Sequence, residues 1–114
     1  MEAIYEMQAN VLRMLAHPRR LEMIHLLAEG PIEVGRIASQ LGISQPNASQ
    51  HLALLRSAGL VELERNGREV SYQLADPQVM VACTIMRGFL QRRISQLSTV
   101  AIAADERLTV GVDA

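Results

Sequence analysis

The sequence has little cysteine and few aromatic residues. Tryptophan is absent, phenylalanine and cysteine occur once each, and tyrosine occurs twice. The core must therefore be built from Leu, Ile, Val and Met side chains. A single cysteine excludes an internal disulfide bond and a cysteine-rich zinc site, which favours a reducing compartment, the cytoplasm. No apolar run reaches the length of about 18 residues that a membrane span needs, and the N-terminus lacks a signal-peptide pattern.

An excess of charge of one sign is also missing. The chain contains eleven basic and twelve acidic residues, so its formal net charge is −1. A nucleic-acid-binding protein usually has a basic excess, and the balance counts mildly against one, although charge can be segregated by face. A hydrophobic content of 49% with 20% charged residues is typical of a globular protein. The 114 residues predict one domain.

The sequence lacks the motifs of an enzyme. It contains no Gly-rich phosphate loop, no histidine spaced from a nucleophile and no paired carboxylates in an apolar setting. His17, His25 and His51 do not have the spacing of metal ligands. We therefore expect no enzymatic activity, no cofactor and no metal site, and we interpret His25 as a histidine at the core or its rim.

Helical periodicity marks the first 41 residues. A first helix over 3–16 places one apolar stripe on Ile4, Met7, Val11, Leu12 and Leu15. A second helix begins at Pro18 and ends before Gly30 and Pro31, with an apolar face of Leu21, Ile24, Leu27 and Ala28. A short third helix is predicted over 33–41, and its inward face comprises Val34, Ile37, Ala38 and Leu41. The next residue, Gly42, ends this helix in a tight turn.

A fourth helix begins in the stretch SQPNASQHLALL, residues 44–55. Ser44 is a good N-cap, and Pro46 is tolerated in the first turn. One face of this helix is apolar and comprises Ala48, Leu52 and Leu55. The opposite face begins with short, uncharged polar residues, several of which are poor helix formers. Something other than helix stability must favour them.

Residues 60–74 change from helical to alternating periodicity, which predicts a β-hairpin. Asn66 and Gly67 between the two strands are a strong signal for a two-residue turn. This turn would pair Leu63 with Val70 and Val61 with Tyr72 on one apolar face. The same register would set Glu64 opposite Glu69 and Arg65 opposite Arg68. Such like-charge pairs are costly and need a reason.

A long helix over 77–102 follows a cap at Asp76 and Pro77. Its apolar stripe covers about half of the helix circumference and comprises Val79, Ala82, Cys83, Ile85, Met86, Phe89, Leu90, Ile94 and Leu97. One packing surface does not require so wide a stripe. We therefore expect it to contact both its own domain and a second chain. The tail, 104–114, carries no readable motif.

Two short helices joined by a glycine turn and followed by a hairpin describe a winged helix-turn-helix. The expected fold is α+β and mostly helical, a single domain over 1–103 with the helix-turn-helix at 33–58 and the wing at 60–74. This fold explains the polar start of the fourth helix. Asn and Gln can make paired hydrogen bonds to adenine edges, and Ser can bond to a base or a phosphate. A simpler interpretation is a capped helix with a solvated polar face.

Five arginines are candidates for phosphate contact. Two arginines that face each other at a wing tip repel unless an anion lies beside them, and arginine fits phosphate well. A solvated turn with both side chains splayed is the other interpretation of Arg65 and Arg68. Arg56, on the flank of the fourth helix, favours phosphate. For Arg19 and Arg20 a phosphate contact and a solvated or ion-paired role are equally compatible with the sequence.

The segments LAHPRRLEMIHLL, SQPNASQHLALLRSAGLV and RNGREVSYQL resemble the ArsR family of small bacterial repressors. The resemblance covers residues 10–90 and implies a homodimer that binds a palindromic operator in double-stranded DNA. It implies that the first and last helices dimerise, here through Ile4, Val11, Leu15, Met86, Leu90, Ile94 and Leu97. It also implies a DNA-binding set of Ser44, Gln45, Asn47, Ser49, Gln50, His51, Arg56, Arg65 and Arg68.

The residues that form the metal- and thiol-sensing sites of that family are not all found at the matching positions of this sequence. Metal-sensing members carry a Cys-x-Cys pair on the third helix, which here reads IEVGRIASQL. Others use Asp-x-His early in the last helix, which here reads Asp76-Pro77-Gln78. Thiol-based members use two cysteines, whereas Cys83 is alone and falls at the edge of the apolar stripe. We expect Cys83 to be a packing residue rather than a thiol sensor, and any inducer to be organic, to be a partner protein, or to be absent.

The competing functional interpretation is a winged-helix module for protein–protein docking. Such a module would need neither the polar recognition helix nor the arginine pair at the wing tip. Retention on a mixed-sequence DNA column that falls with salt would distinguish the two functions.

Overall fold

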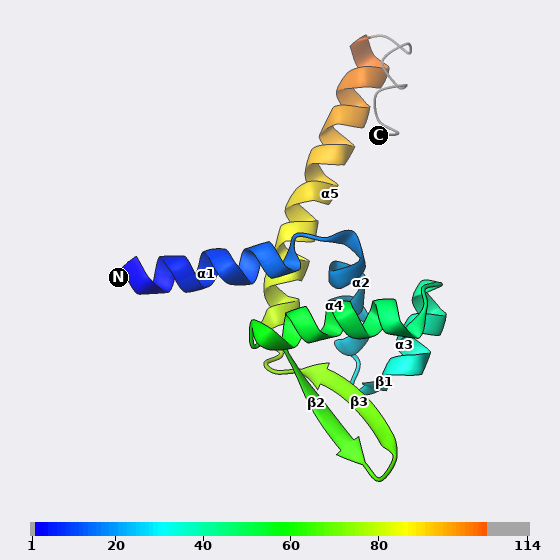
Figure 1. Ribbon diagram of the computed structural model, residues 1–114. Helices are drawn as coiled ribbons and strands as arrows, with labels where there is room; N and C mark the ends of the chain where they lie inside the picture. The colour runs from blue at the N-terminus through cyan, green and yellow to red at the C-terminus, as the bar shows by residue number, and fades with distance from the viewer. Residues whose placement is uncertain (1, 105–114) are drawn as a thin grey trace. The chain divides into compact units, whose positions relative to one another are not determined.

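The computed structural model describes residues 2–104 of the chain, which divides into two compact units, Met1–Met80 and Val81–Ala114 (Figure 1). The elements follow in the order α1, α2, β1, α3, α4, β2, β3, α5. The observed class is therefore α+β, a winged helix-turn-helix with additional helices at its two ends, as the sequence predicted. The tail lies outside the described residues, apart from Ala104.

The first two helices begin and end close to the predicted residues. Helix α1 covers Glu2–Leu15, and α2 covers Pro18–Leu27. Proline suits the first turn of α2 because the missing N–H would have no partner inside the helix. His17 caps the same helix, since its Nδ1 accepts a hydrogen bond from the backbone N–H of Arg19 at 3.1 Å.

The helix-turn-helix consists of α3, Val34–Leu41, and α4, Gln45–Ser57. Between them Gly42 adopts the left-handed conformation at φ 67°, which an L side chain rarely tolerates. Ser44 is the N-cap of α4, and its Oγ accepts a hydrogen bond from the N–H of Asn47 at 3.2 Å. These residues confirm the predicted turn and the predicted start of the fourth helix.

The core lies among α2, α3, α4 and the first residues of β2. Its largest fully buried side chains are Met23, Ile24, Leu27, Ile37, Leu52, Leu55 and Val61. The predicted apolar face of the second helix was partly wrong, because Leu21 is 42% exposed and Ala28 is exposed. The buried stripe of α2 runs through Met23, Ile24 and Leu27, and both of the misassigned residues lie about 100° away from it around the helix.

A three-stranded antiparallel sheet has the order β1-β3-β2. Strands β2, Val61–Asn66, and β3, Glu69–Leu74, form the wing. The strand β1, Ile32–Glu33, pairs with β3 and was not predicted, since two residues are too short to show alternation. Its Ile32 lies opposite Tyr72, which in turn lies opposite Leu63, so the three side chains form one row on the same face of the sheet.

The predicted register of the wing was wrong by two residues. Leu63 pairs with Tyr72 and Val61 with Leu74, so the turn consists of Gly67 and Arg68 rather than Asn66 and Gly67. Gly67 has φ 65°, and within residues 2–104 no residue other than glycine has a positive φ. This pattern fits a type II′ turn, which needs glycine only at its first central position.

The physical reason for the shift is electrostatic. A displacement of two residues keeps every side chain on the predicted face of the sheet. It replaces the like-charge pairs, however, because Glu64 now lies opposite Ser71 and Arg65 opposite Val70. Like charges directly opposite each other destabilise a sheet, so the observed register removes a cost that the predicted one would carry.

The last helix, α5, covers Gln78–Ala104, close to the predicted range of 77–102. Asp76 stabilises its start, because Oδ1 accepts a hydrogen bond from the N–H of Gln78 at 2.8 Å. Large apolar side chains of this helix are 46–69% exposed within the single chain: Val81, Ile85, Met86, Phe89, Leu90, Ile94 and Leu97. None of the described helices is both long enough and apolar enough to cross a membrane.

Candidate nucleic-acid interface

Helix α4 has one face fixed in the core and one face open. Ala48, Leu52 and Leu55 are completely buried, with 0% exposure, and therefore fix the rotation of the helix about its axis. Gln45, Asn47 and Gln50 are exposed on the other side, and Ser49 is half-buried. The open face thus presents amides that can donate and accept hydrogen bonds, at the N-terminal end of a helix.

Two residues of the predicted DNA-binding set also have structural contacts. Ser44 is exposed, but its Oγ accepts the capping hydrogen bond of α4. Gln45 lies along α3, since its Oε1 is 3.5 Å from the position that a Cβ on Gly35 would occupy. An alanine at position 35 would therefore make ordinary van der Waals contact with the amide of Gln45.

His51 belongs to a cluster that the sequence did not reveal. Its ring lies 4.5 Å from the ring of His17, and its Nδ1 accepts a hydrogen bond from Nε of Arg20 at 3.2 Å. Burial lowers the pKa of His51, and the neighbouring His17, Arg20 and Arg19 lower it further. Periodicity could not detect this cluster, because its members come from different helices that are far apart in the sequence. His51 thus faces α2 rather than lying free on the open face.

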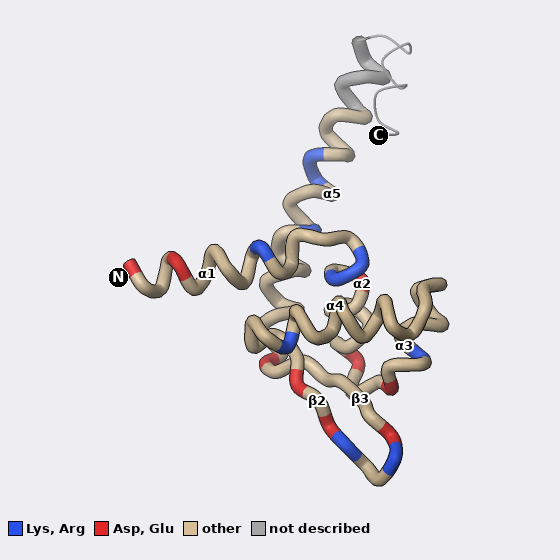
Figure 2. The backbone as a smooth tube through the Cα atoms, in the orientation of Figure 1, with Lys and Arg blue, Asp and Glu red and all other residues tan. Residues whose placement is uncertain are grey.

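Three exposed arginines lie on α4 and on the wing. Arg56 lies in the last turn of α4, Arg65 near the end of β2, and Arg68 in the wing turn. Figure 2 shows basic residues close to the wing tip and acidic residues along its two strands. Across the described residues the salt bridge is that between Arg19 and Glu22, at 3.2 Å, so the three guanidinium groups are not ion-paired. They are therefore open to phosphate.

The new register separates the two wing arginines. Arg65 lies directly opposite Val70 and shares its face of the sheet with Leu63, whereas Arg68 projects from the turn itself. The two side chains do not face each other, so the repulsion that the sequence suggested is absent. The carboxylates of Glu62, Glu64 and Glu69 lie on the other face, where they would repel phosphate. The lower part of the apolar face is buried against the core, since Val61 and Tyr72 are buried, so the residues suited to approach DNA are Arg65 and Arg68 near the tip.

The residues predicted to dimerise lie on α1 and α5. On α1, Ile4 is 56% exposed, whereas Val11 and Leu15 are half-buried, and no residue of this helix is fully buried. On α5, Met86, Leu90, Ile94 and Leu97 are 49–58% exposed. Exposed apolar area of this extent on a helix is typical of a protein–protein interface.

Cys83 lies on α5 and is half-buried. Burial raises the pKa of its thiol, and the guanidinium of Arg87 acts in the opposite direction with the smaller effect. A raised pKa leaves less thiolate at neutral pH, and the thiolate is the reactive form. Within the described part of the chain, no three His, Cys, Asp or Glu side chains are grouped so that they could hold a metal ion.

Comparisons with known proteins place this geometry in a family. The sequence profile described as "Bacterial regulatory protein, arsR family" matches residues 17–62, which include the helix-turn-helix. The uncharacterized HTH-type transcriptional regulator Rv0081 of Mycobacterium tuberculosis is 35% identical over 107 residues, which cover 93% of this chain and 92% of that protein. This chain belongs to the arsR family. That family consists of transcriptional regulators and not of enzymes.

Solved structures agree with the arsR assignment. The crystal structure of Rv0081 superposes with a TM-score of 0.74 at 34% identity, covering 82% of this chain and 94% of that one. A second similar structure is a homodimeric winged helix-turn-helix DNA-binding domain from Mycobacterium bovis, described as "a possible ArsR-family transcriptional regulator". It superposes with a TM-score of 0.77 at 32% identity, and the match covers 83% of this chain and 88% of that one.

A further relative matches part of this arsR protein. The biofilm growth-associated repressor of Xylella fastidiosa is 44% identical over 68 residues. The alignment spans 60% of this chain and 60% of that repressor.

Proposed function

We propose that this arsR-family protein is a homodimeric repressor that binds a palindromic operator in double-stranded DNA. The observation that carries the proposal is the division of α4. Three side chains at 0% exposure fix the helix in the core, and the amides of Gln45, Asn47 and Gln50 are left open. Amides of this kind make paired hydrogen bonds to adenine in the major groove.

Each segment has a role in this proposal. Helices α3 and α4 enter or flank the groove, with Gln50 reading bases together with Ser44, Gln45, Asn47 and Ser49. The wing tip and Arg56 contact the phosphate backbone, which gives affinity without sequence preference. His51 is assigned to the interface only indirectly, through its contact with Arg20.

Dimerisation is assigned to the apolar faces of α1 and α5. Burial of a Leu, Ile or Phe side chain contributes about 1.5–3 kcal/mol, so the exposed side chains of α5 could stabilise a dimer strongly. The homodimeric relative from Mycobacterium bovis supports this assignment. We infer that the protein acts in the cytoplasm, that any inducer is organic or a protein, and that Cys83 is a packing residue.

Selection of bound fragments from genomic DNA tests the function. The proposal expects enrichment of one imperfect palindrome, and binding to mixed-sequence DNA that weakens steeply as salt increases. A docking module for proteins would show neither enrichment nor salt-dependent retention on a DNA column. Either of those negative results would contradict the proposal.

A further inference from the structure

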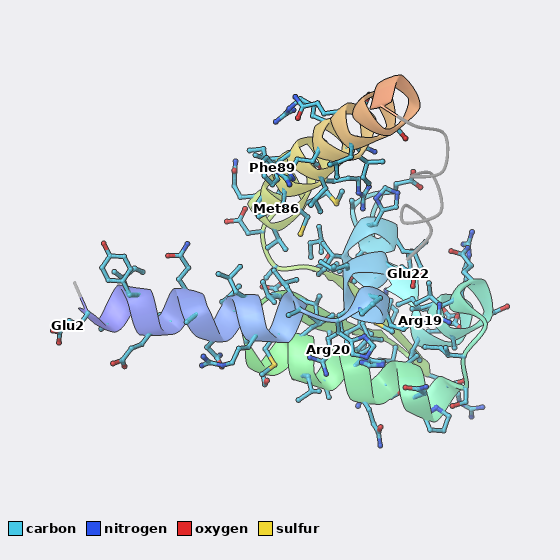
Figure 3. All side chains as sticks on the ribbon, turned by 90° about the horizontal axis from the view of Figure 1, so that it is seen from above. Glu2, Arg19, Arg20, Glu22, Met86 and Phe89 are labelled. Carbon is cyan, nitrogen blue, oxygen red and sulfur yellow. The ribbon has the colours of Figure 1, made fainter. Side chains whose placement is uncertain are left out.

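Arg20 lies where three helices meet. From α2, its Nη1 donates a hydrogen bond to the carbonyl oxygen of Met14 in the last turn of α1, at 3.1 Å. Its Nε donates to Nδ1 of His51 on α4, at 3.2 Å. Figure 3 shows Arg20 between α2 and α4, with Arg19 beside it pointing along a different side of α2. One guanidinium therefore joins the end of α1 to the recognition helix.

The contact requires His51 to be neutral. An imidazole nitrogen accepts a hydrogen bond only when it carries no proton, so Nδ1 of His51 must be unprotonated and the ring proton must lie on Nε2. His17, whose ring packs on His51, is fixed in the same way, because its Nδ1 accepts from the N–H of Arg19. A proton on Nδ1 of His51 would place a second cation against Arg20 and remove its acceptor.

The charged and titratable groups that face His51 all act in one direction. Arg20 and Arg19 come from α2 and His17 from the link between α1 and α2, and each of them disfavours a proton on His51. Burial disfavours it more than any of them. Arg19 is partly neutralised by its salt bridge to Glu22. Within the described residues, no carboxylate and no charged group of α1, α3 or β2 is among the groups that shift the pKa of His51.

We propose that Arg20 is a positioning residue that couples the end of α1 to the recognition helix, and that this coupling holds only while His51 is neutral. The inference rests on the proposed function, in which α4 reads the operator and α1 helps to hold two protomers together. Acidification would then weaken the discrimination between operator and other DNA. It would not weaken general attraction to DNA, because a protonated His51 adds positive charge near the phosphate backbone.

Arg20→Met and Arg19→Met form a matched pair for the first test. Both substitutions remove one arginine charge from adjacent positions, but only the first removes the two hydrogen bonds that join the helices. We expect Arg20→Met to lower the ratio of operator affinity to scrambled-DNA affinity about tenfold. Arg19→Met should leave that ratio unchanged. Equal ratios in the two variants would overturn the positioning role of Arg20.

His51→Asn and His17→Asn test the dependence on protonation. Asparagine at position 51 can still accept from Arg20 but cannot be protonated, and asparagine at position 17 can still cap α2. In the wild type and in His17→Asn, the affinity ratio should fall as the pH decreases from 7.5 to 5.5. In His51→Asn the ratio should stay constant. A ratio that rises on acidification in the wild type would overturn the proposal and favour a direct contact of His51 with DNA.

A measurement without DNA separates this inference from the proposed function. In the folded chain the pKa of His51 is below the ordinary 6.5, so as the pH falls below 6.5 the unfolded chain takes up this proton first. The stability that neutral His51 contributes is complete above that pH and is lost below it. The wild-type Tm should therefore fall more steeply below pH 6.5 than that of His51→Asn, and amide exchange in α4 should quicken in Arg20→Met but not in Arg19→Met.

These outcomes distinguish the two proposals. If the DNA-free results hold and the protein shows no operator preference at any pH, the function is wrong and the coupling stands. If operator preference is strong but the Tm profiles of wild type and His51→Asn coincide, the coupling is wrong and the function stands.

Discussion

The helix-turn-helix core and helix α5 are built from the same kinds of residue but bury them differently. Seven large side chains of the core, all Met, Ile, Leu or Val, are less than 2% exposed. Seven large apolar side chains of α5 are 46–69% exposed. The core side chains are buried within a single chain. The α5 side chains are not buried within one chain, and this difference supports the proposal that α5 packs against a second copy of the protein.

The substitution Leu90→Glu should have the largest effect on this contrast. Leu90 is 49% exposed in the single chain, and in a dimer a carboxylate at this position would lose its hydration without gaining a partner. We expect the dissociation constant of the dimer to increase at least about a hundredfold, which corresponds to roughly 3 kcal/mol. Sedimentation velocity at micromolar concentration measures this change.

Gln91→Glu is the matched control, because it adds the same charge one residue away on the polar side of α5. It should leave the dimer intact. A wild-type protein that sediments as a monomer, or a Leu90→Glu variant that remains dimeric, would show that the exposed apolar face of α5 does not form a dimer interface.

Leu52→Ala and Leu90→Ala compare the two regions directly. Leu52 is completely buried, and its truncation should lower the free energy of unfolding by about 2–5 kcal/mol at every protein concentration. Leu90→Ala should lower stability only through the dimer, so its effect should depend on protein concentration. Chemical denaturation at several concentrations checks both expectations, and a concentration-dependent loss in Leu52→Ala would argue against a core formed within one chain.

Gln50→Ala and Arg68→Ala separate reading from attraction within the DNA-binding region. Gln50→Ala should weaken operator binding by about 1–3 kcal/mol and relax base preference. Arg68→Ala should weaken all sequences alike and reduce the slope of log affinity against log salt by about one. Titration of operator and scrambled duplexes at several salt concentrations measures both. Unchanged affinity and preference in Gln50→Ala would show that α4 is not the reading helix.

Cys83→Ser should have the smallest effect. The thiol is half-buried and its pKa is raised, so it is a poor nucleophile at neutral pH. The variant should bind operator like the wild type, with or without an oxidant and with or without zinc. A wild type that loses affinity on oxidation, beside a serine variant that does not, would instead make Cys83 a sensor.

The local features of the fold were predictable from the sequence. The N-cap at Ser44, the left-handed Gly42 and the buried face of Ala48, Leu52 and Leu55 each depend on residues a few positions apart. Backbone sterics and helical periodicity are sufficient to predict such features.

Features that depend on partners distant in the sequence were missed or misplaced. The strand β1 forms only because β3 lies beside it, and the contact between His51 and Arg20 exists only once α2 and α4 pack together. The wing register was misplaced because an Asn-Gly pair favours one turn, whereas the cross-strand charges favour another that keeps the same apolar face. The open face of α4 was predicted, but the inward contact of His51 was not.

In the proposed complex, two copies of α4 read two half-sites on one face of DNA. The most direct test is to measure binding of the selected operator while the spacing of its half-sites is changed. We expect half-site centres about 10 bp apart to bind two protomers together. Inserting about 5 bp, half a helical turn, should turn one half-site to the opposite side and reduce affinity to that of a scrambled duplex. Equal affinity at both spacings would contradict the claim.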